Sequence, residues 1–464
     1  MKKKILGALA LASLVSVSLT SCNSNVVSDF IVPENFDTQS EITVTFWNTM
    51  GDNLQSTLNE AIDGFRQYYP NVHVESTQIG GYDDVKSQII TEMGTGNYPS
   101  LAYCYDDHVA AYNEAEITVP LNDLMSNAKY GFGGSEVEYS IQESDIIEGF
   151  RTSKDTFGDG NIYTLPFLRS TEVLYYNETF FKEHELKVPE TWEELWQTCA
   201  EIKEIDPNST PLGYDSEANF FITLCEAYGY DYTTANSDTV EGHFIFDNDN
   251  TNEMIKQLRQ YYDLGYFTTQ KLYNAYTSGL FTSTTDNKCY MCIGSSAGAT
   301  YQYSASFTAN IAKLPQAEGK KAAAISQGPS LVFFNKGDDQ EILAAWLFAQ
   351  YLLTPEIQAS FALISGYMPV TTPATLVDAY VAEMAKAGTD SKTALATLSI
   401  TTALSQRDSY FTSDVFVGSS DARDQVGSLI ASVLADKTIT KDNMAEKIKQ
   451  YFVDAVDKCV YLAS

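Results

Sequence analysis

The sequence contains little of what an enzyme of its length normally depends on. It has only four histidines, His73, His108, His184 and His243, and no two of them stand at the spacing of metal ligands. The metalloprotease motif HExxH and the phosphate-binding loop GxxxxGK[ST] are both absent. Positive charge is scarce, since 29 Lys and Arg face 61 Asp and Glu, and the net charge of −32 repels phosphate backbones. These absences argue against a metalloenzyme, an ATPase and a nucleic-acid-binding protein.

Long apolar runs are missing as well, apart from the first residues. Three lysines, at positions 2–4, precede an apolar run from Ile5 to Leu19, which is too short for a transmembrane helix and typical of a secretory signal. Leu19-Thr-Ser-Cys22 follows and resembles a bacterial lipobox, which predicts that residues 1–21 are removed and that Cys22 carries lipid. Ordinary secretion with cleavage nearby is the alternative. Residues 22–40 lack apolar periodicity and are expected to form a tether.

Neither the cysteines nor the acidic clusters form a convincing metal or redox motif. Cys289-Tyr-Met-Cys292 is one CxxC without a second pair, and its alternating surroundings predict a buried strand in which both cysteines act as small hydrophobic residues. Asp247–Glu253 resembles a calcium loop but lacks the glycine and the twelfth-position glutamate, so a solvated helix start is the preferred interpretation. No disulfide, metal or cofactor is expected.

The order of periodic segments predicts an α/β protein. Extended patterns at 42–47, 72–75 and 100–105 alternate with helical patterns at 54–69 and 85–93. The alternation restarts after a loop-rich stretch at 130–160, with extended patterns at 163–176, 288–293 and 330–334 and helical patterns at 192–205, 253–264 and 340–353. The last hundred residues look mainly helical. With 464 residues, the chain is long enough for two lobes, each a parallel sheet covered by helices, with a ligand cleft between them.

Aromatic residues are abundant and suggest what such a cleft would bind. The chain has 30 Tyr, 24 Phe and 4 Trp. Sugars present apolar C–H faces and a rim of hydroxyls, and sites for them combine aromatic faces with short polar side chains and backbone donors. Most of these rings must belong to the core, so the candidates are aromatic residues at strand ends and in turns rich in Gly and Ser.

Several segments resemble the family 1 extracellular solute-binding proteins, the receptors for sugars and glycerol phosphates in ABC import. They occur in the family's order across the expected mature chain: TVTFWN (43–48), FRQYYPNVHV (65–74), GNYPSL (96–101), IYTLPF (162–167), STEVLYYN (170–177), VPETWEEL (188–195) and GYMPV (366–370). The resemblance implies a type II periplasmic-binding-protein fold. It also implies a lipid-anchored, monomeric receptor on the extracytoplasmic face that delivers a carbohydrate to ABC permease subunits and catalyses no reaction.

The resemblance also implies where ligand is bound. Within the family the likeness is greatest to glycerol-3-phosphate and glycerophosphodiester receptors, whose site pattern falls on these residues: Tyr82, Asp106, Ser170, Ser296, Gly328 and Tyr367. Trp47 is a further candidate for ligand binding. The tyrosines can offer a ring face and a hydroxyl, the serines short donors, and Gly328 close backbone approach. As alternatives, the tyrosines only pack and Gly328 only forms a turn.

Two departures from that pattern bear on the ligand. Asp106 stands where the related receptors have glutamate, and Phe416 stands where they have an arginine. Because a buried phosphate needs a cationic partner, this favours a neutral sugar or oligosaccharide over a glycerol phosphate, unless Arg169 or Arg423 substitutes. A secreted glycosidase or phosphodiesterase and an adhesion lipoprotein remain alternatives from other classes. The expected lobes comprise residues 41–165 with 314–366, and residues 166–313 with 367–464.

Overall fold

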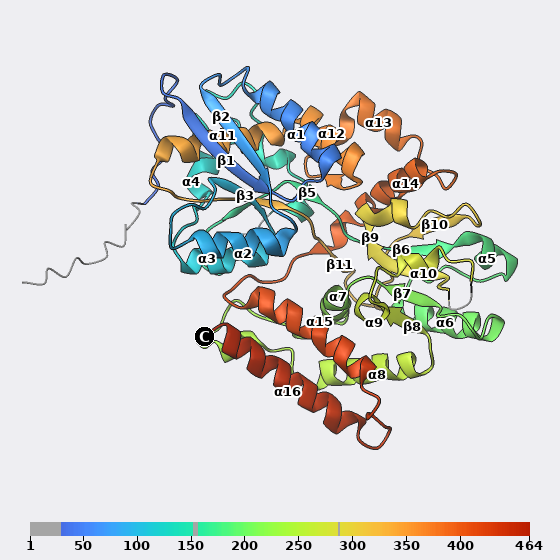
Figure 1. The fold of residues 1–464 in the computed structure, drawn as a ribbon. Helices are drawn as coiled ribbons and strands as arrows, with labels where there is room; N and C mark the ends of the chain where they lie inside the picture. Colours follow the sequence, from blue (N-terminus) through green and yellow to red (C-terminus); the bar gives the residue numbers. More distant parts are fainter. Residues whose placement is uncertain (1–28, 152–155, 286–287) are drawn as a thin grey trace, which may run out of the picture.

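The structure, a computed structural model, describes residues 29–151, 156–285 and 288–464 and contains two five-stranded sheets (Figure 1). The first sheet has the order β2-β1-β3-β12-β4, and the second has the order β10-β6-β9-β7-β8. The strands of the first are β1 (Ile42–Asn48), β2 (Val72–Gln78), β3 (Leu101–Cys104), β4 (Thr164–Pro166) and β12 (Ser330–Phe333). Those of the second are β6 (Glu172–Asn177), β7 (Leu212–Tyr214), β8 (Phe267–Thr269), β9 (Met291–Ser295) and β10 (Ala309–Ala312). We refer to each sheet with its covering helices as lobe 1 and lobe 2.

Both sheets are mixed rather than parallel, which corrects the expectation from the sequence. In lobe 1, β1 is parallel to β2 and β3, but β12 is antiparallel to β3 and β4. In lobe 2, β7 is parallel to β8 and β9, whereas β6 is antiparallel to β9 and β10. The antiparallel strands are those at which the chain leaves or re-enters a lobe. They have no crossover helix within their own lobe to bring the chain back in the same direction.

Helices cover both faces of the first sheet, as the alternation of segments predicts. One face, with Phe46 and Leu331, packs against α1 and α11, while the other, with Ala102 and Val332, packs against α2 and α3. The helices of lobe 1 are α1 (Asp52–Phe65), α2 (Tyr82–Glu92), α3 (Val109–Glu114), α4 (Asn122–Ser126), α11 (Asp339–Leu352) and α12 (Pro355–Ser365). Among the described residues, no helix has both the length and the apolar character needed to cross a membrane.

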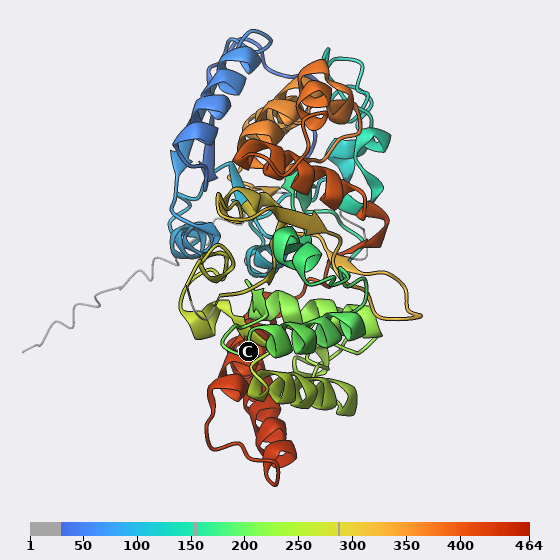
Figure 2. The ribbon, with the colours of Figure 1, turned by 90° about the vertical axis from the view of Figure 1, so that its right-hand side faces the viewer.

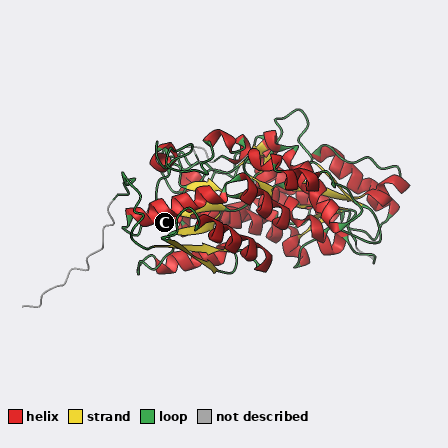
Figure 3. Ribbon diagram, turned by 90° about the horizontal axis from the view of Figure 1, so that it is seen from above, coloured by secondary structure: helices red, strands yellow, loops and turns green. Residues whose placement is uncertain are grey.

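The second sheet is likewise enclosed on two sides (Figures 2 and 3). One face, with Leu174 and Ile293, belongs to a core shared with α6, α7 and α8, and α14 packs against β6 and β10. The helices are α5 (Glu178–Glu183), α6 (Trp192–Ile205), α7 (Glu217–Tyr228), α8 (Asp249–Asp263), α9 (Gln270–Tyr273) and α10 (Ser278–Phe281). The C-terminal part adds α13 (Asp378–Met384), α14 (Lys392–Leu404), α15 (Ser419–Ala435) and α16 (Met444–Leu462), of which α15 packs on α7 and α16.

The chain passes between the two sheets through extended segments. Residues 167–171 lead from β4 to β6, and residues 313–329 lead from β10 back to β12. Each crossing contains a two-residue strand that pairs with a strand from the C-terminal part of the chain. These pairs are β5 (Leu168–Arg169) with β13 (Met368–Pro369), and β11 (Ala324–Ile325) with β14 (Tyr410–Phe411). Ser170 and Gln327 form a bridge between the two crossings. The boundary residues given above for the lobes stay a prediction.

The first described residues are not a free tether, contrary to the expectation for residues 22–40. Phe30, Val32 and Phe36 pack against the lobe 1 core, and the Phe36 ring contacts Tyr69 edge to face at 5.2 Å. The Phe36 amide also donates to the Tyr130 hydroxyl at 2.8 Å. The residues from about position 30 onward are therefore part of lobe 1. The signal sequence and Cys22 lie outside the described residues.

The CxxC motif and the acidic stretch that resembles a calcium loop both have structural roles. Cys289 and Cys292 are buried free thiols, and Cys292 lies within β9, as the alternating pattern predicts. The Asp247–Glu253 stretch begins α8, because the Asn248 side chain accepts hydrogen bonds from the amides of Asn250 and Thr251. The other four described cysteines, Cys104, Cys199, Cys225 and Cys459, are buried and free too.

Candidate functional site

A cavity of about 1320 Å³ lies between the two lobes. Lobe 1 contributes Asn53, Tyr105 and the end of α12, and lobe 2 contributes residues around β7, β9, α10 and α15. The crossing segments form another part of the lining, with Ser170, Gln327 and Gly328. The lining includes many alcohols, amides and tyrosines, together with apolar side chains such as Leu363, Met384 and Ile400. We refer to this cavity as the cleft.

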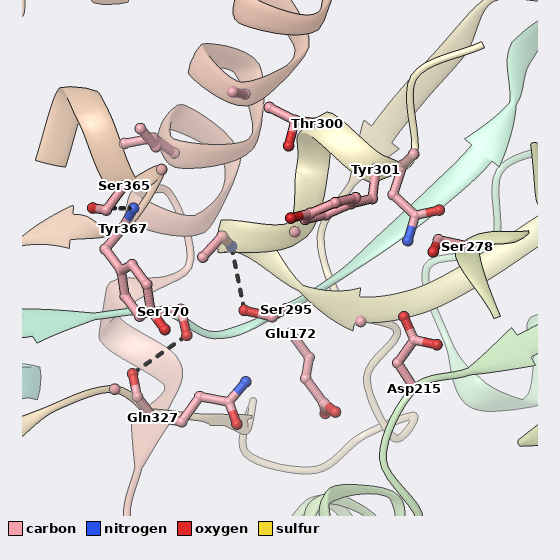
Figure 4. A pocket seen from close by; sticks show the side chains of 18 of the residues that line it. Ser170, Glu172, Asp215, Ser278, Ser295, Thr300, Tyr301, Gln327, Ser365 and Tyr367 are labelled. Atoms are coloured by element: carbon pink, nitrogen blue, oxygen red, sulfur yellow. Dashed lines mark hydrogen bonds between the residues drawn. The ribbon is translucent and has the colours of Figure 1, made fainter. Parts of the chain in front are cut away.

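Figure 4 shows side chains that line the cleft. Tyr367 and Ser170 stand on one side of the view, where the Ser365 hydroxyl accepts a bond from the Tyr367 amide at 3.2 Å. Tyr301, Thr300 and Ser278 stand on the other side, and the carboxyls of Glu172 and Asp215 lie below them. The cleft therefore combines rings, hydroxyls and carboxyls, a set that suits a polyhydroxylated solute.

A short polar network fixes the one arginine among the cleft residues. Arg423, on α15, donates to the side-chain oxygen of Asn219 on α7. The Asn219 amide in turn donates to the Gln327 side chain on the second crossing at 2.9 Å. All three line the cleft, so a guanidinium is held in its wall by groups from two helices and the crossing segment.

This architecture agrees with the comparisons to known proteins. The profile of the bacterial extracellular solute-binding proteins matches residues 60–388, which is more than two thirds of the chain. The chain belongs to this family. It is an extracellular solute-binding protein, the class of receptor that serves ABC importers, and not an enzyme.

The binding protein is similar to several characterised relatives. The sn-glycerol-3-phosphate-binding periplasmic protein UgpB is 25% identical over 359 residues in Yersinia pestis, covering 71% of this chain and 74% of the relative. The UgpB of Escherichia coli K12 is 26% identical over 356 residues, covering 72% and 76%.

Solved structures show the same fold at low sequence identity. Mycobacterium tuberculosis UgpB in complex with glycerophosphocholine aligns with a TM-score of 0.70 at 18% identity, covering 90% of this chain and 98% of that one. The GacH receptor of Streptomyces glaucescens, described unliganded and with acarbose, aligns with a TM-score of 0.66 at 16% identity and the same coverages. The two-lobed fold predicted from the resemblance is thereby confirmed.

The structure brings only part of the predicted site of the binding protein to the cleft. Ser170, Gly328 and Tyr367 line it. Tyr82 stands one layer behind, because its ring stacks at 4.3 Å on Tyr105, which does line the cleft. Whether these residues contact a ligand stays a prediction.

Gly328 also has a structural requirement for glycine. Its φ of +131° is a conformation that side chains rarely adopt. A Cβ at this position would lie 2.5 Å from the Leu168 carbonyl oxygen of the other crossing. The turn interpretation of this glycine and its place in the cleft wall are therefore compatible.

The other three predicted residues lie away from the cleft lining. Trp47, on β1, packs against the lobe 1 cluster beside α2 and α3. Asp106 borders a separate small cavity of about 150 Å³ and faces Arg169 at 3.9 Å. Ser296 is 1% exposed, and its hydroxyl accepts from the Thr171 amide at 3.2 Å, while the neighbouring Ser295 lines the cleft.

The sequence around Ser296 also matches a motif that is typical of hydrolases. Gly294-Ser-Ser-Ala-Gly298 matches GxSxG, the turn that presents the nucleophile in α/β-hydrolases. A nucleophile must be exposed at the end of its strand, yet the Ser296 hydroxyl, just after β9, is buried and accepts from the Thr171 amide. In the binding protein the motif forms a strand end.

The argument from Phe416 is not supported by its position. Phe416 is part of the lobe 2 core, where its ring stacks on His243 with centroids 4.6 Å apart. It therefore adds no ring to the cleft. Arg169, one of the two proposed substitutes, is also unsuitable, because it is 3% exposed and engaged by backbone carbonyls. Arg423 is the cation that reaches the cleft.

Glu172 is a cleft residue that reasoning from sequence did not single out. It begins β6, and its carboxyl accepts from the Tyr214 hydroxyl at 2.7 Å and from Thr223 at 3.3 Å. Burial raises the pKa of Glu172 to about 7, although these hydrogen bonds and the Arg423 charge oppose the shift. At neutral pH this carboxyl is therefore poised between its two protonation states.

A pH-dependent stability follows from Glu172. Between its ordinary pKa and about 7, the folded state holds a proton that the unfolded state has lost, so the free energy of unfolding falls as pH rises through this window. We expect the contribution to be roughly 3 kcal/mol. Urea unfolding of wild type and Glu172→Gln at pH 5 and pH 8 measures it, because the variant should lack this part of the slope. Equal slopes for both proteins would contradict the assignment.

Proposed function

We propose that the protein captures a sugar or oligosaccharide in the cleft and delivers it to the permease of an ABC importer. The observation that carries the proposal is the cleft itself, whose volume of about 1320 Å³ exceeds the range of roughly 300–1000 Å³ usual for small-molecule sites. Its lining of alcohols, amides and tyrosines offers the partners that a chain of sugar rings requires. Structures of the same fold include receptors described with acarbose and with maltotriose.

A glycerol-3-phosphate or glycerophosphodiester ligand is the second candidate, and one observation favours it. Arg423 places a guanidinium in the cleft wall, and charge-assisted bonds from arginine are the usual partners of phosphate. The relatives named for glycerol 3-phosphate support the same candidate. Against it stand the carboxyls of Glu172, Asp215 and Glu383, which line the same cleft and repel a phosphate.

Calorimetry with maltotriose and glycerol 3-phosphate separates the two candidates. We expect the neutral sugar to bind more tightly, and Tyr367→Ala to weaken it by roughly 1–3 kcal/mol through lost stacking. Arg423→Gln should change sugar affinity little and abolish any binding of glycerol 3-phosphate. Arg407→Gln is the matched control, since Arg407 is largely exposed and outside the cleft lining.

Each result of that experiment has a distinct meaning. Tight binding of glycerol 3-phosphate alone, lost in Arg423→Gln, would replace the sugar proposal by the second candidate. If neither these ligands nor a wider set of neutral oligosaccharides binds, the carbohydrate proposal is wrong.

Attachment to the membrane is part of the proposal. We infer from Leu19-Thr-Ser-Cys22 that the mature protein begins at a lipid-modified Cys22 and acts as a monomer on the extracytoplasmic face. The compact packing of residues 30–37 on lobe 1 is compatible with this, because it would place lobe 1 close to the anchor.

A further inference from the structure

One wall of the cleft gathers hydrogen-bond acceptors that have no donor to satisfy them. Asp215 follows β7, and its Oδ1 accepts from the amide and the hydroxyl of Thr277, both at 2.6 Å. Its Oδ2 has only a weak neighbour, the Cys292 thiol at 3.9 Å. Within the described residues this second oxygen therefore lacks a strong donor, and it belongs to a residue that lines the cleft.

A second acceptor lies beside the same sulfur. Gln302 is 2% exposed and also lines the cleft, and its Nε2 contacts Cys292 Sγ at 3.5 Å. Its Oε1 is buried and has no hydrogen-bond partner among the described residues. Because Asp215 Oδ2 and Gln302 Nε2 both contact Cys292 Sγ, the two side chains lie in one part of the wall. A buried acceptor without a donor is costly, so a ligand that donates hydrogen bonds to this wall gains from it.

Two tyrosines that are unusually exposed for their size stand in the same region. Tyr276, next to Thr277, is 65% exposed, and Tyr301, next to Gln302, is 74% exposed, yet both line the cleft. Figure 4 shows Asp215 pointing toward Ser278, with Tyr301 across the same part of the cleft. Tyrosine faces attract cations that approach within about 6 Å of the ring centre. Arg423, the one cation among the described lining residues, donates to Asn219 and makes no hydrogen bond or ion pair with Asp215 or Gln302.

We propose that Asp215, Gln302, Tyr276 and Tyr301 form a subsite for a primary ammonium group, so that the solute is an amino sugar or an oligosaccharide containing one. An ammonium donates three N–H bonds, of which two can satisfy Asp215 Oδ2 and Gln302 Oε1 while the charge faces the rings. A quaternary ammonium fits less well, because it has no N–H to give to these oxygens. Burial raises the pKa of Asp215, because desolvation disfavours its charged form. The inference rests on the proposed function and specifies its ligand.

Matched ligand pairs test the subsite. Calorimetry with sugars and their amino counterparts, in which –NH₃⁺ replaces –OH or –NHCOCH₃, should show at least a tenfold preference for the amine in one or more pairs, such as glucosamine oligomers against N-acetylglucosamine oligomers. Asp215→Asn keeps the acceptor for Thr277 and should abolish this preference while leaving the affinity for the hydroxyl or acetyl partner within about threefold. Asp408→Asn is the control, because this carboxyl is almost fully exposed and lies outside the cleft lining, so the variant should leave the preference unchanged.

The outcomes separate this inference from the proposed function. Neutral sugars that bind without any preference for amines would overturn the ammonium subsite and leave carbohydrate capture intact. A choline-bearing ligand that binds more tightly than every primary amine, with the same loss in Asp215→Asn, would overturn the assignment to amino sugars. A preference for amines that survives in Asp215→Asn would place the recognition elsewhere and overturn it as well. If no sugar of either kind binds, the proposed function fails first.

Discussion

Replacing Arg169 with methionine is expected to lower the free energy of unfolding by about 3–5 kcal/mol, a large fraction of the total stability of a typical domain. Arg169 lies on β5, in the first crossing between the lobes, and is 3% exposed. Its guanidinium donates to the carbonyls of Gly328 and Pro329 at 3.2 and 2.8 Å and to the Ser330 hydroxyl at 2.7 Å. The side chain thus ties the two crossings together, and its loss leaves several buried acceptors without a donor.

The carboxyl partner of Arg169 makes the test more specific. Asp106 Oδ2 lies 3.9 Å from Arg169 Nη2, and Asp106 Oδ1 has no hydrogen-bond partner among the described residues. Removing the arginine alone leaves a carboxylate without its cation, so the double variant with Asp106→Asn should recover part of the loss. Urea unfolding of the two single variants and the double variant measures this coupling. Arg407→Met, at an exposed position, is the control. A loss under 1 kcal/mol in Arg169→Met would show that the stability of the two crossings does not depend on this side chain.

Replacing Cys22 with alanine is expected to release the protein from the membrane almost completely. Each buried methylene of an acyl chain contributes about 0.8 kcal/mol, and two chains together hold a protein at the bilayer for long times. Detergent phase partitioning of cells that express wild type and Cys22→Ala measures the effect, and mass spectrometry of the N-terminus identifies the lipid. The variant should appear in the aqueous phase or as an unprocessed precursor.

A neighbouring substitution controls for effects on secretion in general. Ser24→Ala lies outside the Leu19–Cys22 motif and should partition as wild type does. If Cys22→Ala protein of mature size still enters the detergent phase, the anchor lies elsewhere and the lipobox interpretation is wrong.

The helices and strands with one apolar and one polar face could be predicted from the sequence. The helix expected at 192–205 is found at Trp192–Ile205, because Thr191 caps it and Glu194 closes a capping box. No comparable signal marks α7, which is buried nearly all round and so has no polar face to give it a period. Strands β7 and β8 have three residues each, too few for alternation to stand out.

The candidate site could be predicted only where the resemblance supplied it. Ser170, Gly328 and Tyr367 came from family motifs, and they do line the cleft. From the sequence, Arg423 is named only as a substitute for the arginine absent at position 416, and Asp215 is not named at all, because a single charged residue after a short strand or on a helix looks the same as a solvated surface residue. Only the packing of α7, α10 and α15 around the cleft gives these two residues their setting.

The burial of every described cysteine has a practical consequence for measuring domain motion. All six thiols are shielded, and burial raises the pKa of each, so they react slowly with maleimides. A single cysteine introduced on the surface would thus be the main target of a fluorescent dye. Lys86 of α2 in lobe 1 donates to Ser420 of α15 in lobe 2 at 3.0 Å, so dyes at these two positions would report the separation of the lobes. The receptor is thus suited to conversion into an optical sensor of its own solute.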